Sequence, residues 1–178
     1  MRIGVISDTH GLLRPRVFDL FEGVDHILHA GDICDDSTLD ALAAVAPVTA
    51  VAGNNDGFRC AGAGAEARVT LGGLRIYMTH MIGRPGRPSP PVAGVLAGDP
   101  VDLVVFGHSH LPHDERIDGV WFFNPGSAGP RRFDYPVTVG FLEADRAGTW
   151  HGRHAGLDPA SVRALRSPLW RNRLSRGF

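Results

Sequence analysis

Short polar clusters follow apolar runs at five points of this 178-residue chain. Each run is five or six residues long and rich in aliphatic side chains, which is typical of buried strands. Segments with helical spacing separate the first three runs, so strands and helices alternate early in the chain. The runs are 2–7, 25–30, 48–52, 74–79 and 102–106, and the helical segments are 15–21 and 37–46. This pattern predicts an α/β protein with polar loops at the carboxyl ends of its strands.

The second half of the chain is richer in strands. Gly-containing turns at 72–73, 118–119 and 146–148 separate paired apolar segments, as in hairpins. We therefore expect two packed sheets with helices on the outside. Two segments, 58–67 and 83–91, contain many Gly, Ala or Pro residues and are expected to be surface loops.

The composition, 43% hydrophobic and 21% charged, is typical of one globular domain over residues 1–178. No apolar stretch approaches the roughly 18 residues of a membrane span, so we expect a cytoplasmic protein without a membrane partner. Residues 158–178 carry five Arg and one Asp. We expect this tail to be helical and exposed; a nucleic-acid partner is an alternative that no binding motif supports. The tail or an edge strand could also mediate a homo-oligomer.

The polar clusters supply seven oxygen and nitrogen side chains of the kinds that bind divalent metal ions. These are Asp8, His10, Asp32, Asn54, His80, His108 and His110. In open α/β sheets, ligands bind beyond the carboxyl ends of the strands, which is where these residues fall. Carboxylate, amide and imidazole donors suit manganese, iron, zinc or nickel, and the many His argue against magnesium or calcium. The sequence therefore predicts a metal centre for redox-neutral hydrolysis.

Each cluster taken alone also has an ordinary structural explanation, because Gly-Asp and Gly-Asn are common in turns. Asp8 and His10 are two residues apart, as are His108 and His110. In an extended backbone, residues two apart point to the same side, so each pair is expected to face one point. The order of the clusters and their shared position at strand ends favour a single site.

In this order the clusters resemble the signature of the calcineurin-like metallophosphoesterases. Within that family, Ser7–Gly11, Thr79-His80 and Asn124–Ser127 are similar to the small, capless phosphodiesterases of bacteria and archaea. The resemblance extends from Met1 to about Glu143 and implies a four-layer α/β/β/α sandwich with two metal ions. It implies that Asp8, His10 and His110 bind one ion, that Asn54, His80 and His108 bind the other, and that Asp32 bridges them.

The resemblance further implies a small phosphate-ester substrate and attack by metal-activated water, with Asp32 and Asn54 at the catalytic centre and no side-chain nucleophile. Manganese is the favoured metal, with iron, nickel or zinc as alternatives. Four residues are expected around the ligands: Asp56 to orient an imidazole, Asn124 to shape the site, Asn55 beside the substrate, and Arg131 as a phosphate clamp. Arg132, Arg14 and Arg84 are alternatives for the clamp, and an exposed salt bridge is the ordinary role for any one of these arginines.

Asn55 is a departure from the family pattern. Many members carry a His there that can protonate the leaving oxygen, and Asn cannot act as a general acid. Two alternatives to a phosphodiesterase are open. One is a phosphomonoesterase, and the other is a protein-interaction scaffold like the retromer subunit of this fold, which has lost part of its metal cage. This chain retains every ligand position, which favours catalysis.

Overall fold

The computed structural model describes residues 1–57 and 62–167. Its first sheet has the strand order β12-β11-β1-β2-β3. The strands are β1 (Arg2–Ile6), β2 (His26–His29), β3 (Val48–Ala50), β11 (Thr138–Ala144) and β12 (Trp150–Gly156). β1, β2 and β3 are parallel, β11 is antiparallel to β1, and β12 is antiparallel to β11. The carboxyl ends of β1, β2 and β3 therefore lie at one edge of this sheet.

The second sheet has the order β4-β5-β8-β10-β9. Its strands are β4 (Glu66–Leu71), β5 (Leu74–Thr79), β8 (Leu103–Val105), β9 (Pro112–Ile117) and β10 (Val120–Pro125). β5, β8 and β10 are parallel to one another, so their carboxyl ends also share an edge. A separate two-stranded hairpin, β6 (Gly83–Arg84) and β7 (Arg87–Pro88), follows β5.

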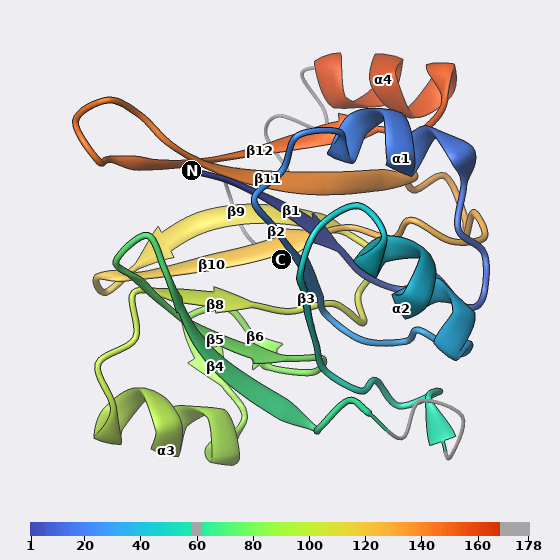
Figure 1. Cartoon of the computed structure of the whole chain (residues 1–178). Coiled ribbons are helices and arrows are strands. Elements are labelled where there is room, and N and C mark those ends of the chain that lie inside the picture. The colour runs from blue at the N-terminus through green and yellow to red at the C-terminus, as the bar shows by residue number, and fades with distance from the viewer. Residues whose placement is uncertain (58–61, 168–178) are drawn as a thin grey trace.

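The two sheets face each other across an apolar core, and helices cover their outer faces (Figure 1). Ile3, Val5 and Leu28 of the first sheet pack with Ile76 and Phe123 of the second. The helices are α1 (Pro15–Phe21), α2 (Asp36–Ala43), α3 (Pro90–Gly98) and α4 (Pro159–Arg166). Figure 1 shows α1, α2 and α4 on the first sheet's side and α3 on the second sheet's side. The predicted four-layer α/β/β/α sandwich is confirmed.

Local sequence explains where three of the helices begin. Pro15 occupies the first turn of α1, where its missing N–H would have no helical partner. The carboxylate of Asp35 accepts a hydrogen bond from the Ser37 amide at the start of α2, and Asp158 accepts one from the Ser161 amide at the start of α4. α4 covers only 159–166 of the tail expected to be helical, and residues 168–178 lie outside the described residues.

The prediction that both segments are surface loops was partly wrong. β4 begins at Glu66, inside the segment 58–67, of which 58–61 lie outside the described residues. The segment 83–91 contains the β6–β7 hairpin and the first residues of α3. The prolines favoured a loop in the sequence analysis, but Pro90 and Pro91 occupy the first turn of α3, where proline is tolerated. Helix 37–46 also ends earlier than expected, at Ala43.

None of the helices within the described residues is long and apolar enough to cross a membrane.

Leu28→Ala should lower the free energy of unfolding by about 2–5 kcal/mol, because Leu28 is fully buried between the sheets and its truncation leaves a cavity. Urea denaturation measures this change. Leu12→Ala is the control, since Leu12 is 39% exposed and its truncation should change stability by less than about 0.5 kcal/mol. Similar losses for the two variants would contradict the assignment of the core.

Candidate metal centre

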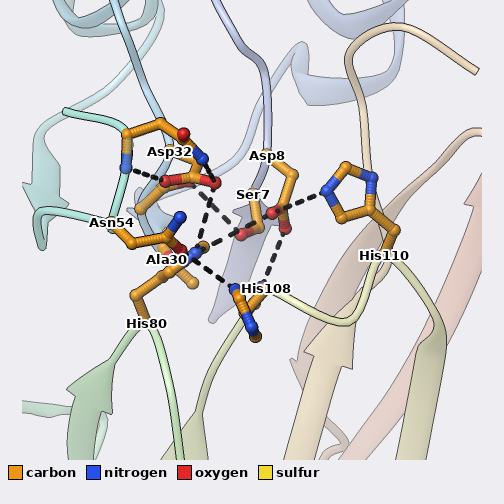
Figure 2. Close-up of polar contacts among 12 residues, drawn as sticks. Ser7, Asp8, Ala30, Asp32, Asn54, His80, His108 and His110 are labelled. Atoms are coloured by element: carbon orange, nitrogen blue, oxygen red, sulfur yellow. Dashed lines mark hydrogen bonds and ion pairs between the residues drawn. The ribbon is translucent and has the colours of Figure 1, made fainter. Parts of the chain in front are cut away.

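Five loops meet where the carboxyl ends of both sheets adjoin (Figure 2). They follow β1, β2 and β3 of the first sheet and β5 and β8 of the second. Each contributes at least one of the seven predicted donors: Asp8 and His10, Asp32, Asn54, His80, and His108 and His110. Figure 2 shows Asp8, Asp32, Asn54, His80 and His108 directed toward one another. The fold thus brings together residues up to 102 positions apart, from 8 to 110.

One group of possible metal ligands consists of Asp8, His10 and His110. The Nε2 atom of His110 lies 3.2 Å from Oδ1 of Asp8 and 3.4 Å from Nε2 of His10. The rings of His10 and His110 are stacked with their centroids 5.3 Å apart. This is the set that the family resemblance assigned to one metal ion.

A second group consists of Asp8, Asp32 and His80, all buried. The Oδ2 atom of Asp32 lies 3.4 Å from Nε2 of His80 and 3.7 Å from Nε2 of His10. Asp32 therefore lies within 4 Å of one His from each group, and Asp8 belongs to both groups. Asn54 and His108 adjoin the second group: Oδ1 of Asn54 lies 3.0 Å from Nδ1 of His108, whose ring packs edge-on against His80 at 5.3 Å.

Unpaired buried atoms make this cluster suitable for a cation. In the described part of the chain, Oδ1 of Asp8, Nε2 of His80 and Nδ1 of His110 are buried without a hydrogen-bond partner. Buried polar atoms normally have partners, because leaving them unpaired costs about 1–3 kcal/mol each. The other ring nitrogen of His80 lies 2.7 Å from the carbonyl of Ala30, which fixes the proton on Nδ1 and leaves Nε2 with a lone pair toward the carboxylates. The donor set fits a divalent metal ion.

The electrostatics of the cluster also favour positive charge. Burial tends to raise the pKa of Asp32, but contacts with His80 and Asn55 outweigh it and hold this pKa well below its usual range. Burial likewise tends to lower the pKa of His80, but Asp32, the Ala30 carbonyl and Asp8 raise it overall. The same negative potential that raises the pKa of His80 would attract a cation. By contrast, burial lowers the pKa of His10, which favours the neutral ring that binds metals.

The backbone at the ligands differs from the sequence-based expectation. Asp8 and His10 have φ of 54° and 48°, and His108 and His110 have φ of 65° and 59°. These are left-handed conformations, so the residues two apart converge by a repeated turn and not by extension. Asp32 and Cys34 repeat the alternation, with φ of 53° and 66°. Such conformations cost of the order of 1–3 kcal/mol each and are characteristic of functional sites.

Hydrogen bonds between the loops hold this backbone. The amides of Asp8 and His10 donate to the carbonyls of Gly31 and Asp32, both at 2.9 Å. Close packing explains two motif glycines: a Cβ atom on Gly53 would overlap Asp32, and one on Gly107 would overlap the hydroxyl of Ser7. The Gly of Gly-Asn and that of Gly-His are therefore required by contact between strand ends.

Asp56 was expected to orient an imidazole, but the structure shows a different role for this buried residue. Its two carboxylate oxygens accept hydrogen bonds from the backbone amides of Gly53, at 2.6 Å, and Cys34, at 2.7 Å. Asp56 thereby joins the loop that carries Asp32 to the loop that carries Asn54. Its effect on the ligands acts through the backbone.

Asn55 and Asn124 both contact the ligand loops. The Asn55 side-chain amide donates to Oδ2 of Asp32 at 2.7 Å, and its backbone amide donates to Oδ1 at 2.9 Å. The Asn124 side-chain amide donates to the carbonyl of Gly107 at 2.8 Å and to the hydroxyl of Ser109 at 3.1 Å. Asn124 thus supports the loop between His108 and His110.

Arg131 does not face the cluster. Its guanidinium donates to the carbonyl of Tyr135, to Asp158 at 2.7 Å and to the hydroxyl of Ser161 at 3.1 Å, and so ties its loop to the start of α4. Arg132, the next residue, places Nη2 3.4 Å from Nε2 of His10. The two side chains are chemically identical, and the helix on one side of the loop determines which of them points to the cluster. Arg131 thus has the salt-bridging role that the sequence left open, and of these two arginines only Arg132 lies beside the cluster.

Two further residues support His10 and its loop, and sequence reasoning missed the first of them. The Cys34 sulfur lies 3.8 Å from Nδ1 of His10. The signal was available, since Cys34 follows Asp32 at the same spacing of two as the ligand pairs. His29 is fully buried; its Nδ1 accepts from the Gly31 amide, which leaves the Nε2 proton to face Thr9 in the loop between Asp8 and His10. Burial lowers the pKa of His29 to about 4, so this ring is neutral at pH 7.

Asp56→Ala should weaken Mn²⁺ binding roughly 10–100-fold, because the loops carrying Asp32 and Asn54 lose their shared partner. The free energy of unfolding should also fall by about 1–3 kcal/mol, since two amides lose their acceptor. Calorimetric titration with Mn²⁺ and urea denaturation measure the two effects. Asp40→Ala, on the exposed side of α2, is the control and should change neither. Unchanged Mn²⁺ affinity in Asp56→Ala would contradict this role.

Comparison with known proteins gives one consistent family. Residues 1–147 match the model of the calcineurin-like phosphoesterase superfamily domain. The chain is 35% identical over 135 residues to a Methanocaldococcus jannaschii protein named as a probable metallophosphoesterase, covering 71% of this chain and 68% of that protein.

Two solved structures illustrate the range of similar folds. An archaeal phosphodiesterase matches with a TM-score of 0.70 and 25% identity over 87% of this chain and all of that one. Vps29 from Entamoeba histolytica matches with a TM-score of 0.67 and 22% identity over 89% of this chain and all of its own, a level that shows the fold alone. With the match over residues 1–147, this chain belongs to the calcineurin-like phosphoesterase superfamily.

Proposed function

We propose that this protein is a metal-dependent phosphodiesterase that hydrolyses small phosphate diesters with water as the nucleophile. The observation that carries the proposal is the convergence of seven metal-type donors from five strand ends, with three buried atoms that lack partners. Clusters of this kind are destabilising unless a cation completes them. Family membership and the similarity to an archaeal phosphodiesterase give independent support.

We assign two divalent cations to the cluster, one held by Asp8, His10 and His110 and the other by Asn54, His80 and His108, with Asp32 between them. Manganese is the metal we favour, with iron, nickel and zinc as alternatives. Two such cations would acidify a water at neutral pH and offset charge on a phosphoryl group. Asp8 belongs to both groups of possible ligands, and Asp32 lies within 4 Å of both His10 and His80. Both observations support this assignment.

Arg132 is the protein group that we assign to the phosphate. Its guanidinium lies beside His10, so it could donate to a phosphoryl oxygen held at the centre. The structure provides no general acid at position 55, where the Asn side chain is hydrogen-bonded to Asp32. The leaving oxygen therefore has to depart with little protonation from that position, which favours esters of acidic alcohols.

The two alternatives receive less support. A phosphomonoesterase would use the same centre, and comparing turnover of bis-p-nitrophenyl phosphate with that of p-nitrophenyl phosphate separates the two activities. A scaffold function is favoured only by the shared fold of Vps29. The complete set of donors in this chain argues for catalysis.

Asp32→Ala should reduce hydrolysis of bis-p-nitrophenyl phosphate to the background rate, because both groups of ligands lose the carboxylate between them. Circular dichroism should show that the fold is retained, and elemental analysis should show loss of bound manganese. Asp19→Ala is the control, since Asp19 is exposed and, among the described residues, pairs only with Arg16. Wild-type turnover by a metal-verified Asp32→Ala sample would refute the assigned centre.

Methyl p-nitrophenyl phosphate should be hydrolysed far faster than dimethyl phosphate, because p-nitrophenolate leaves without a proton whereas methoxide does not. Released p-nitrophenol and methanol measure the two rates after manganese reconstitution. Asn55→His should reduce the difference between the two hydrolysis rates, because the His supplies a proton donor. Equal rates for the two esters in the wild-type protein would show that another group protonates the leaving oxygen.

A further inference from the structure

A cavity of about 120 Å³ is lined by residues that neighbour proposed metal ligands in the chain, and we call it the side cavity. Residues 83–85 of the β6 hairpin form one wall, and Phe106, Ser109, Leu111 and His113 form the rest. Ser109 lies between His108 and His110, and Gly83 comes three residues after His80. The side cavity is therefore built from the same loops that carry three proposed metal ligands.

The lining of the side cavity is largely apolar but includes an unpaired polar group. Phe106, Leu111 and Pro85 supply hydrocarbon surface. His113 is only 5% exposed, and its Nε2 atom is buried without a hydrogen-bond partner. The nearest carboxylate oxygen, on Glu115, is 3.6 Å from this nitrogen, beyond hydrogen-bond distance. Burial lowers the pKa of His113 to about 4, so the neutral ring can donate or accept one hydrogen bond at pH 7.

A positive charge adjoins the apolar surface. Arg84 is exposed at the side cavity and, among the described residues, has neither an ion pair nor a side-chain hydrogen bond. A guanidinium can stack on a planar ring or donate to polar atoms at its edge. Apolar walls with a few polar groups are typical of small-molecule sites. A volume near the roughly 150 Å³ of a cavity that admits benzene suits one ring.

We propose that the side cavity is a subsite that binds one ester arm of the substrate as a planar ring with a polar edge, such as an aryl group or a nucleobase. This inference rests on the proposed phosphodiesterase function, because the phosphate has to occupy the adjacent metal centre. The ring packs against Phe106 and Leu111, and its polar edge gives His113 the partner that the protein does not supply. The side cavity thereby selects diesters with one ring-bearing arm.

Three diesters with the same leaving group test this selection in the manganese-loaded protein. Methyl p-nitrophenyl phosphate has a small retained arm, bis-p-nitrophenyl phosphate an aryl arm, and the p-nitrophenyl ester of thymidine 5′-phosphate a nucleobase arm. At least one ring-bearing diester should have a KM lower by about tenfold or more, after correction for the two leaving groups of the bis ester. The better of the two identifies the kind of ring. Equal KM values for all three overturn the proposal.

Leu111→Trp should fill the side cavity and remove this preference, so that in this variant KM for the ring-bearing diester equals KM for the methyl ester. Leu12→Trp is the matched control, because it adds the same bulk two residues from His10 but outside the side cavity. A preference that survives Leu111→Trp, or that disappears equally in Leu12→Trp, overturns the proposal.

His113→Leu distinguishes binding from a structural role. It should raise KM for the ring-bearing diester several-fold without lowering Tm, because the atom removed has no partner in the protein. A marked fall in Tm with no change in KM would show that His113 is structural and would overturn its assignment.

Binding of two phosphonates, which the enzyme cannot hydrolyse, separates this proposal from the proposed function. Calorimetry should show that the manganese-loaded protein binds phenylphosphonate more tightly than methylphosphonate, and that Leu111→Trp abolishes the difference. Equal affinities in the wild-type protein overturn the subsite. Ring preference among the phosphonates without hydrolysis of any diester would support the subsite and refute the phosphodiesterase function.

Discussion

Close contact between strand ends of two different sheets is the constraint on which the site depends. The apolar core stacks the sheets so that the carboxyl ends of β1, β2 and β3 adjoin those of β5 and β8. The contact between the His80 ring and the carbonyl of Ala30, at 2.7 Å, joins the two sheets directly. Glycines at 53 and 107 make the approach possible, since a Cβ atom at either would overlap a neighbouring loop. Without this contact, Asp32 and His80 would lie on separate edges.

The site is built from features that each oppose folding. Buried carboxylates, buried imidazoles with unpaired nitrogens and left-handed ligand residues all cost free energy. Extensive burial on both faces of each sheet, together with hydrogen bonds such as those of Asp56, offsets this cost. Cation binding would recover part of it by giving the unpaired atoms a partner, so metal affinity and stability are linked.

The substrate side of the centre has a polar and an apolar part. Arg132 brings one guanidinium next to His10, where a phosphate would lie under the proposed function. The side cavity adjoins the other end of the cluster through Ser109 and presents hydrocarbon surface with the unpaired nitrogen of His113. Under the two proposals, the metal ligands would hold the phosphate and the side cavity would hold one arm, so the centre would discriminate among diesters.

Much of the fold and the set of candidate ligands could be predicted because both depend on short stretches of neighbouring residues. Aliphatic runs with polar endings indicate strands and their carboxyl ends, and the order Asp-x-His, Gly-Asp, Gly-Asn, His, Gly-His-x-His indicates the family. The prediction failed where a residue's role depends on a distant segment. Helix α3 was missed because Pro90 and Pro91 indicate the end of a helix unless they are known to occupy its first turn, as they do here.

The sequence by itself determined which donor types stand at the strand ends, and therefore the class of chemistry. Tertiary structure alone decided how they are presented. Contacts in the folded chain give Asp8 and His108 a left-handed backbone and place the Asp56 carboxylate against two backbone amides. They also place Arg132, and not Arg131, beside His10. The physical reason is that each of these outcomes is fixed by contacts between loops of different strands, and the energy of such contacts depends on packing that no local pattern encodes.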